Sequence, residues 1–304
     1  MIKIYDIETL EEREILFRGG SGADVSAPVA EILRAVQERG DAALREYTLR
    51  FDGAAPDALA VTAEEVDQAA AQVEPAFLAV LEEAAEHIRA YHARQKRESF
   101  VMTEREGVVL GQRIIPLARV GIYVPGGTAA YPSTVLMNAI PARIAGVGEI
   151  IMVTPPGRDG AVNPHILAAA KIAGVTRIYK VGGAQAVAAL AYGTGTIPQV
   201  DKIVGPGNAY VAEAKRQVFG RVNIDMIAGP SEVLVLADGR SNPAWVAADL
   251  LSQAEHDRMA AAVLVTDSRP LAEAVAHELE RQLAALPRAE IARASLEANG
   301  KLIV

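Results

Sequence analysis

The sequence contains no cysteine, and this absence removes several kinds of chemistry. Disulfide bonds, zinc sites built on thiolates and iron–sulfur clusters all require cysteine side chains. Covalent catalysis by a thiolate nucleophile is excluded for the same reason.

Long apolar runs are also missing. No stretch approaches the roughly 20 apolar residues that a transmembrane helix needs, and residues 1–6 lack the basic-then-apolar pattern of a secretory signal. Lys and Arg number 30 against 38 Asp and Glu, so the formal charge is −8. This balance argues against nucleic acid or an anionic membrane as the main partner. We therefore expect a cytoplasmic enzyme or a binding protein for small molecules.

The chain has 304 residues, of which 51% are apolar, enough for about two domains with sizeable cores. Its first third reads as helix. Ser26 is expected to cap one helix, and Thr62 with Glu65 matches a capping box ahead of another. Apolar residues at spacings of three and four over residues 77–91 predict a further helix. Residues 24–98 are thus predicted to be nearly all helical.

The pattern changes after residue 99. Residues 100–104 and 108–115 read as strands around Glu106 and Gly107, which predicts a hairpin. Short apolar runs then alternate with helical segments, as in parallel sheets covered by helices on both faces. These runs are residues 120–124, 149–154, 177–181, 202–204, 232–237, 261–266 and 301–304. The last run reads as the start of a buried strand, so we expect a C-terminal segment beyond it.

Three glycine-rich turns follow predicted parallel strands, at residues 123–128, 181–186 and 205–208. The second and third turns do not match the G-x-G-x-x-G pattern. In the third turn, Tyr210 stands where the pattern has its last glycine. The carboxyl ends of parallel strands share one sheet edge, and glycines allow close approach of a ligand to the backbone. Together the turns favour a dinucleotide or phosphate crevice, although each alone could be an ordinary strand-to-helix turn.

One predicted helix carries candidate metal ligands. Asn242 and Pro243 mark its start, and Gln253 and His256, three residues apart, share one face. Imidazole is a common zinc ligand and an amide oxygen a rarer one, but zinc needs about four ligands. A solvated helix face is the alternative. Ser231, just before a predicted strand, could donate a hydrogen bond in a cleft or simply form a turn.

Five of these motifs occur in an order that resembles the histidinol dehydrogenase family. They lie at residues 119–127 (RVGIYVPGG), 181–186 (VGGAQA), 202–208 (KIVGPGN), 225–232 (DMIAGPSE) and 250–256 (LLSQAEH). The resemblance covers nearly the whole chain and is densest from about residue 107 to residue 257.

The resemblance implies a zinc- and NAD-dependent enzyme that oxidises L-histidinol to L-histidine. Two hydride transfers would pass through a bound aldehyde and use two NAD molecules, and the family is a homodimer whose site is shared between subunits. By motif position, the implied contacts are Tyr123, Gln185 and Asn208 with NAD, Ser231 with substrate, and Gln253 and His256 with both zinc and substrate.

The resemblance also implies an α/β fold of two Rossmann-like parallel-sheet domains, one inserted in the other. We expect a short N-terminal arm over residues 1–22. Residues 23–119 and 233–304 would form a discontinuous domain that carries the zinc-side helix. Residues 120–232 would form the inserted NAD domain.

This chain departs from the family pattern in one respect. The family takes its acid–base Glu and His from a Pro-Glu-His segment, which does not occur here, and Glu255-His256 already belongs to the zinc-side motif. No catalytic residue is therefore expected within the chain, and the 304 residues alone are expected to be inactive. Without cysteine, activated water is the remaining nucleophile for the aldehyde stage. Two alternatives stay open: a related dehydrogenase of another small polar alcohol, such as a sulfonated diol, and a catalytically inactive NAD-binding protein.

Overall fold

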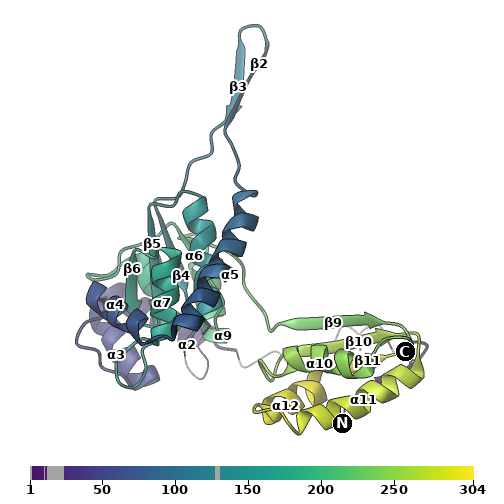
Figure 1. Cartoon of the computed structure of the whole chain (residues 1–304). Helices are drawn as coiled ribbons and strands as arrows, with labels where there is room; N and C mark the ends of the chain where they lie inside the picture. The colour runs from purple at the N-terminus through teal and green to yellow at the C-terminus, as the bar shows by residue number, and fades with distance from the viewer. Residues whose placement is uncertain (1, 10, 12–23, 127–130) are drawn as a thin grey trace. The chain divides into compact units, whose positions relative to one another are not determined.

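The structure, a computed structural model, describes residues 2–9, 11, 24–126 and 131–304 (Figure 1). It divides into two units, Val25–Ile227 and a second one formed by Met1–Asp24 with Ala228–Val304. This grouping differs from the expected one, because residues 25–119 pack with the strands that follow them rather than with residues 233–304. The helices of residues 26–93 supply outer layers for that sheet, which explains the difference.

The larger unit is built on a five-stranded parallel sheet with the order β6-β5-β4-β7-β8. Its strands are β4 (Arg119–Tyr123), β5 (Glu149–Thr154), β6 (Arg177–Lys180), β7 (Lys202–Val204) and β8 (Asn223–Ile224). Central β4 pairs on both sides, so that Val120 lies opposite Ile150 of β5 and Lys202 of β7. The predicted parallel sheet is confirmed here.

Helices cover both faces of this sheet. One face carries α2 (Ser26–Arg39), α3 (Asp41–Asp52), α8 (Gly183–Tyr192) and α9 (Ala209–Val218), and the other carries α4 (Ala63–Gln72), α5 (Pro75–Ala93), α6 (Pro132–Ile144) and α7 (Pro164–Ala173). Alternate β5 residues face opposite cores: Ile151 and Val153 pack on the α8 side, Ile150 and Met152 on the α6 side. Both faces of the strand are therefore buried.

Local sequence signals place several helix ends. Thr62 and Glu65 form the predicted capping box, with the Thr62 Oγ1 accepting from Glu65 N at 3.1 Å and the Glu65 carboxylate accepting from Thr62 N at 2.8 Å. The expectation for Ser26 is wrong by one position, because Ser26 is the first helical residue and Val25 precedes it without a side-chain cap.

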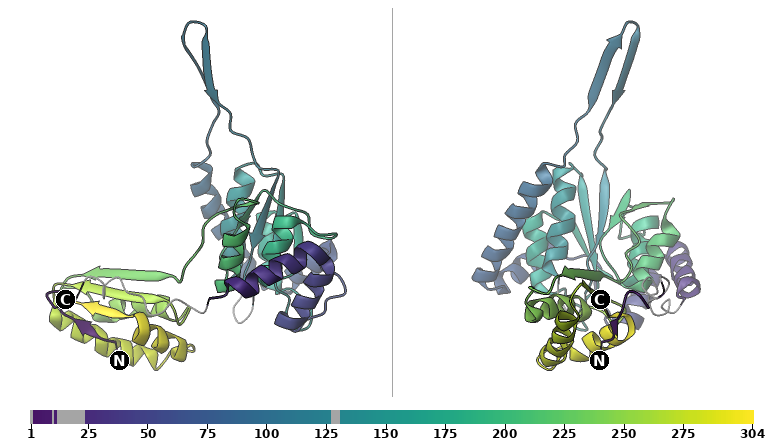
Figure 2. Two further views of the ribbon diagram at one scale, coloured as in Figure 1. Left: turned by 180° about the vertical axis from the view of Figure 1, so that it is seen from behind. Right: turned by 90° about the vertical axis from the view of Figure 1, so that its right-hand side faces the viewer.

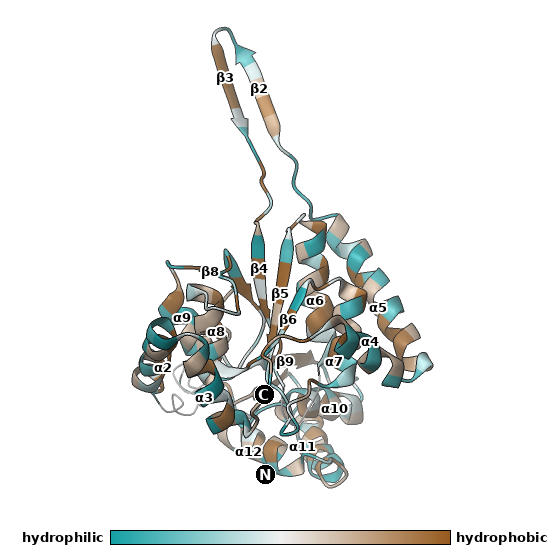
Figure 3. Cartoon of the chain, turned by 90° about the vertical axis from the view of Figure 1, so that its left-hand side faces the viewer, coloured by the Kyte–Doolittle hydropathy of each residue, from teal (hydrophilic) through white to brown (hydrophobic). Residues whose placement is uncertain are grey.

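The predicted hairpin is confirmed. Strands β2 (Phe100–Arg105) and β3 (Val108–Gln112) pair antiparallel around Gly107, whose φ of 74° suits a tight turn. The ribbon extends away from the helices of its unit and carries apolar bands (Figure 3). Its two strands pair only with each other.

The second unit has a four-stranded parallel sheet with the order β1-β11-β10-β9. Its elements are β1 (Ile4–Tyr5), β9 (Glu232–Ala237), α10 (Pro243–Ala254), β10 (Ala261–Thr266), α11 (Arg269–Leu283), α12 (Ala289–Asn299) and β11 (Lys301–Ile303). The three helices lie along one face of the sheet (Figure 2). Ile4 pairs with Leu302, so part of the expected N-terminal arm is a strand; residues 12–22 of that arm lie outside the described residues.

Within the part of the chain that the structure describes, no helix is both long and apolar enough to cross a membrane.

Candidate functional site

The site in the larger unit lies where its strand order reverses. The chain proceeds from β4 outward to β5 and β6, and then returns to β7 on the other side of β4. In open α/β sheets this reversal leaves a crevice beyond the carboxyl ends of the two central strands. Tyr123 ends β4 and the turn at Gly205 follows β7, so two of the predicted glycine-rich turns border the reversal.

The glycine-rich turns approach each other closely, as predicted. A Cβ atom on Gly126 or on Gly182 would lie 2.6 Å from the Pro155 side chain, so the turns after β4 and β6 both pack against the segment after β5. A Cβ on Gly205 would collide with the carbonyl oxygen of Tyr123, and the φ of 111° at Gly205 also favours glycine. Residues 127–130 of the first turn lie outside the described residues.

Tyr123 connects two of these turns. Its side chain is 4% exposed, and its hydroxyl accepts a hydrogen bond of 3.0 Å from the Gly183 N–H at the start of α8. Burial raises the pKa of the Tyr123 hydroxyl to about 12, a shift that the Gly183 N–H opposes and the nearby charge of Asp52 increases. The phenol is therefore neutral at physiological pH and retains a proton to donate.

Gln185 lies two residues beyond Gly183 in α8 and is a buried polar residue of the site. It is 1% exposed, and neither its Oε1 nor its Nε2 atom has a hydrogen-bond partner. Leaving a buried amide unpaired costs about 1–3 kcal/mol per group, and such groups in native proteins call for a partner. A polar ligand group reaching the amino end of α8 would supply one, which fits a nucleotide cofactor.

Asn208 starts the helix after the third turn. Its Oδ1 accepts from Tyr210 N and Val211 N at 3.1 Å each, and it is exposed. Behind this turn, buried Lys215 donates to the Gly205 carbonyl at 3.0 Å and pairs with Asp225, which in turn accepts from Gly205 N at 2.8 Å. The ion pair fixes the turn that presents Asn208.

A cavity of about 490 Å³ opens beside the same turns. Its walls include Pro125, Gly126 and Pro155 from the turns, Glu65 from α4 and Asn163 from the start of α7. This volume lies within the range of small-molecule and cofactor sites. The cavity adjoins the turns after β4 and β5, whereas Tyr123, Gln185 and Asn208 are not among its walls.

The zinc-side residues lie in the second unit. Gln253, half-buried, occupies the last turn of α10, whereas His256 is exposed and lies beyond Ala254, where the helix ends two residues earlier than predicted. The His256 N–H donates to the Gln253 carbonyl at 3.2 Å, so the two remain neighbours across one turn. Ser231, also exposed, immediately precedes β9. Ser231 lies directly before β9, and His256 lies in the loop between α10 and β10.

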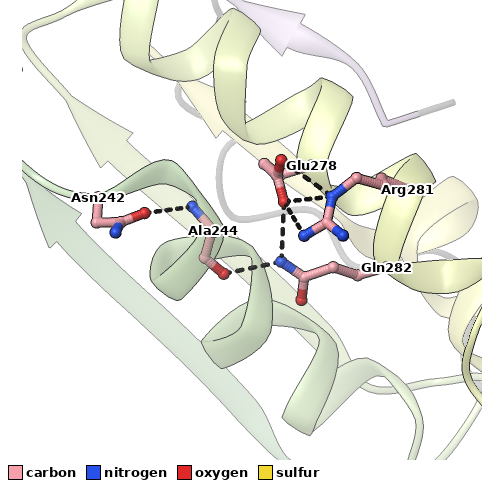
Figure 4. Close-up of polar contacts among 5 residues, drawn as sticks. All are labelled: Asn242, Ala244, Glu278, Arg281 and Gln282. Atoms are coloured by element: carbon pink, nitrogen blue, oxygen red, sulfur yellow. Dashed lines mark hydrogen bonds and ion pairs between the residues drawn. The ribbon is translucent and has the colours of Figure 1, made fainter.

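The start of α10 is fixed by polar contacts with α11 (Figure 4). The Asn242 Oδ1 caps the helix by accepting from Ala244 N at 2.9 Å, as the sequence predicts. Gln282 donates to the Ala244 carbonyl at 2.9 Å and to Glu278, which also binds Arg281. These contacts orient the helix that carries Gln253.

These residues do not complete a zinc site. Among residues 2–9, 11, 24–126 and 131–304, no group of three or more His, Asp or Glu side chains is placed to hold a metal ion. Gln253 and His256 supply at most two of the roughly four ligands that zinc takes.

Sequence reasoning missed two polar residues of α3, Thr48 and Asp52. Thr48 is fully buried, and both the Thr48 Oγ1 and the Asp52 Oδ2 lack a hydrogen-bond partner. The available signal was weak: a Thr and an Asp four residues apart share a helix face, but only the packing of α3 shows that the face is buried.

Comparisons with known proteins agree on one family. The sequence profile of "Histidinol dehydrogenase" matches residues 18–304. The chain is 54% identical to the histidinol dehydrogenase of Listeria monocytogenes serotype 4b over 98% of its own length and 69% of the relative's. It is 60% identical to the histidinol dehydrogenase of Geobacillus kaustophilus over 91% of its length and 65% of the relative's. A crystal structure of histidinol dehydrogenase from Elizabethkingia anophelis matches with a TM-score of 0.94 and 39% identity, covering the whole chain and 71% of that protein.

Proposed function

The chain belongs to the histidinol dehydrogenase family, and on that premise we propose that it takes part in the oxidation of L-histidinol to L-histidine with two NAD molecules. The chain spans about two thirds of the length of these curated relatives. The activity of the whole enzyme is therefore our proposal for it. The observation that carries the proposal is the buried, unpaired amide of Gln185 beside Tyr123, at the reversal of a parallel sheet.

NAD, when bound, supplies the hydride acceptor. The residues of this chain bind and orient it. The Gln185 amide has one donor group and one acceptor atom unpaired, and both would pair with the cofactor. Tyr123 keeps its proton at physiological pH and holds the start of α8 in place. Asn208, fixed by its capping bonds, presents its amide nitrogen at the neighbouring turn.

The residues that we propose for substrate and zinc belong to the second unit. We propose that Ser231 contacts histidinol and that Gln253 and His256 provide two zinc ligands. Because these residues do not complete the metal site, we derive no catalytic step from it. The sequence holds no Pro-Glu-His segment, so no residue of this chain is proposed as the general acid or base. Activated water would serve the aldehyde stage, since no cysteine is present.

The apolar hairpin supports a homodimer. Val101, Val109 and Leu110 are 70%, 71% and 61% exposed, and an isolated two-stranded ribbon is marginally stable in water. Exposed apolar patches of this kind mark protein interfaces. We propose that a second copy of the chain covers the ribbon, in a cytoplasmic enzyme without nucleic-acid or membrane partners.

A protein that binds NAD without catalysis is the second candidate function, since it would have the same glycine-rich turns. A related dehydrogenase of another small polar alcohol would share the cofactor turns too.

A substrate panel tests the proposal. The chain, extended with the family's Pro-Glu-His segment and the residues after it, would be assayed for NADH with L-histidinol and with sulfonated diols. We expect two NADH per histidinol consumed and no reaction with the diols. Reduction of NAD by a diol but not by histidinol would favour the related dehydrogenase. No reaction by folded, zinc-loaded protein would favour the binding protein.

A further inference from the structure

Among the described residues, most of the buried side-chain atoms without a hydrogen-bond partner lie on two helices that contact each other. In this part of the chain, such atoms belong to Thr48, Asp52, Glu149 and Gln185. Glu149 lies between the guanidinium groups of Arg119 and Arg177, at 3.4 and 3.5 Å, so its charge is compensated. The other three lie on the packed helices α3 and α8.

The two helices run antiparallel, which brings the end of α3 to the start of α8. At one end, the Asp41 carboxylate of α3 accepts from the Thr196 hydroxyl, just beyond α8, at 2.7 Å. At the other end, the charge of Asp52 acts on Tyr123, whose hydroxyl is bonded to Gly183 N. The Asp52 carboxylate therefore lies near the amino end of α8, two residues before Gln185.

A cation lies near Asp52 by position, Arg158, whose Cγ lies 4.0 Å from where a Cβ on Gly53 would stand, but the Oδ2 atom of Asp52 has no hydrogen-bond partner. Burial raises the pKa of the Asp52 carboxyl to about 6, and no other influence contributes clearly. Helix α8 carries no charged side chain, and Tyr123 on β4 is neutral. The amino end of α8 offers only a partial positive charge. A half-buried carboxylate in this setting lowers the stability of the folded chain unless a ligand supplies hydrogen-bond donors.

A ribose can supply such hydrogen-bond donors to the Asp52 carboxylate through its hydroxyl groups. Dinucleotide-binding folds use a carboxylate after the second strand to bind ribose hydroxyls, and the same charge repels a 2′-phosphate. Here the second strand, β5, ends at Thr154 and continues with Pro155 and Pro156, so the usual position holds no acid. Asp159, further along, already accepts from Ala161 N at 3.0 Å. Asp52, by contrast, has a buried carboxylate oxygen, Oδ2, without a hydrogen-bond partner, and it lies near the cofactor turns.

We propose that Asp52, supplied by α3 rather than by the sheet, accepts hydrogen bonds from the adenosine ribose hydroxyls of NAD and makes the chain select NAD over NADP. This inference rests on the proposed binding of NAD. It adds a residue outside the glycine-rich turns and a reason for its burial.

Calorimetric titration of the 304-residue chain with NAD and with NADP tests the inference. Asp52→Asn keeps the shape of the side chain and removes its charge. We expect it to weaken NAD binding about 10- to 100-fold, the loss typical of a hydrogen bond to a charged group, and to reduce the preference for NAD over NADP. Asp57→Asn, at an exposed acid of the following loop, should change neither affinity.

The outcomes separate this inference from the proposed function. If wild type binds NAD and Asp52→Asn binds it with the same affinity, the inference alone is overturned. Buried water would then be the partner of the Asp52 carboxylate. A weaker NAD affinity with the same NAD-to-NADP ratio would overturn the contact with the adenosine ribose. No NAD binding by folded wild-type chain would overturn both the inference and the proposed cofactor site.

Discussion

The two parallel sheets of the chain differ in how their faces are covered. The sheet of the larger unit has helices on both faces, and adjacent β5 residues pack into two separate cores. The sheet of the second unit carries α10, α11 and α12 on one face, and on its other face Leu234 and Leu236 of β9 are 64% and 78% exposed. Parallel sheets are normally covered on both sides. The larger unit has this arrangement within itself, and the second unit does not.

The same contrast separates the proposed sites. The residues that we propose for NAD, Tyr123, Gln185 and Asn208, belong to the unit with the doubly covered sheet, in which the glycine-rich turns pack closely. Gln253 and His256 belong to the unit covered on one face and, as proposed ligands, would supply two of the roughly four that zinc takes. On the proposed assignment, cofactor binding can be tested on this chain directly, whereas catalysis and zinc binding are tested on an extended chain.

The largest expected effect concerns turnover. The sequence holds no Pro-Glu-His segment, which is expected to supply the acid–base residues, and general acid–base catalysis contributes about 10²- to 10⁴-fold to rates. We therefore expect histidinol-dependent NADH formation at least 100-fold slower than in the extended chain. Equal rates of NADH formation in the two proteins would contradict the prediction that the 304-residue chain has an incomplete catalytic site.

A pair of leucine substitutions compares the two sheets directly. Leu190 of α8 is fully buried against Gly121 of β4, so Leu190→Ala should lower the free energy of unfolding by about 2–5 kcal/mol. Leu236→Ser on the exposed face should change it by no more than about 0.5 kcal/mol. Chemical denaturation followed by circular dichroism measures both. Similar losses for the two variants would show that the β9 face is covered in solution.

Zinc binding should depend on His256 only when the other ligands are present. The 304-residue chain should lose zinc on dialysis, because two ligands hold it poorly. In the extended chain, His256→Ala should weaken zinc binding at least about 100-fold, judged against the smaller effects of outer-shell changes, with NAD affinity unchanged. The zinc content of each protein after dialysis tests this prediction. Full zinc content in His256→Ala would show that His256 is not a zinc ligand and would favour a solvated helix face instead.

The smallest expected effect is on the stability of the larger unit. The folded-state pKa of Asp52, about 6, lies above the ordinary aspartate value, so the folded chain binds the proton more tightly than the unfolded one. The Asp52 contribution to stability therefore decreases as pH rises from about 4 to 7. Asp52→Asn should be more stable than wild type at pH 7.5 by about 1 kcal/mol or less, allowing for solvent screening. The difference should vanish near pH 4 in denaturant titrations.

Local signals in the sequence predicted much of this fold. Thr62 and Glu65 form their capping box, and Asn242 caps α10, because such caps depend on residues within one turn. The hairpin at Gly107 and most strand positions follow from short-range patterns as well. The convergence of the glycine-rich turns was predictable from the rule that parallel strands end at one edge.

Long-range packing could not be predicted in the same way. Strand β1 is two residues long and exists through its pairing with β11, nearly 300 residues away. The end of α10 at Ala254 places His256 outside the helix that the spacing suggested. The position of Asp52 near the start of α8 depends on the antiparallel packing of α3 on α8, which no local pattern encodes.

Calorimetry with NAD tests the central claim, that the larger unit holds the cofactor site, most directly. We expect the wild-type 304-residue chain to bind NAD in a saturable way. Gln185→Leu should abolish that binding while leaving the chain as stable as wild type or more so, because it replaces an unpaired buried amide with an apolar side chain. Undiminished NAD binding by Gln185→Leu, or none by folded wild type, would contradict the account.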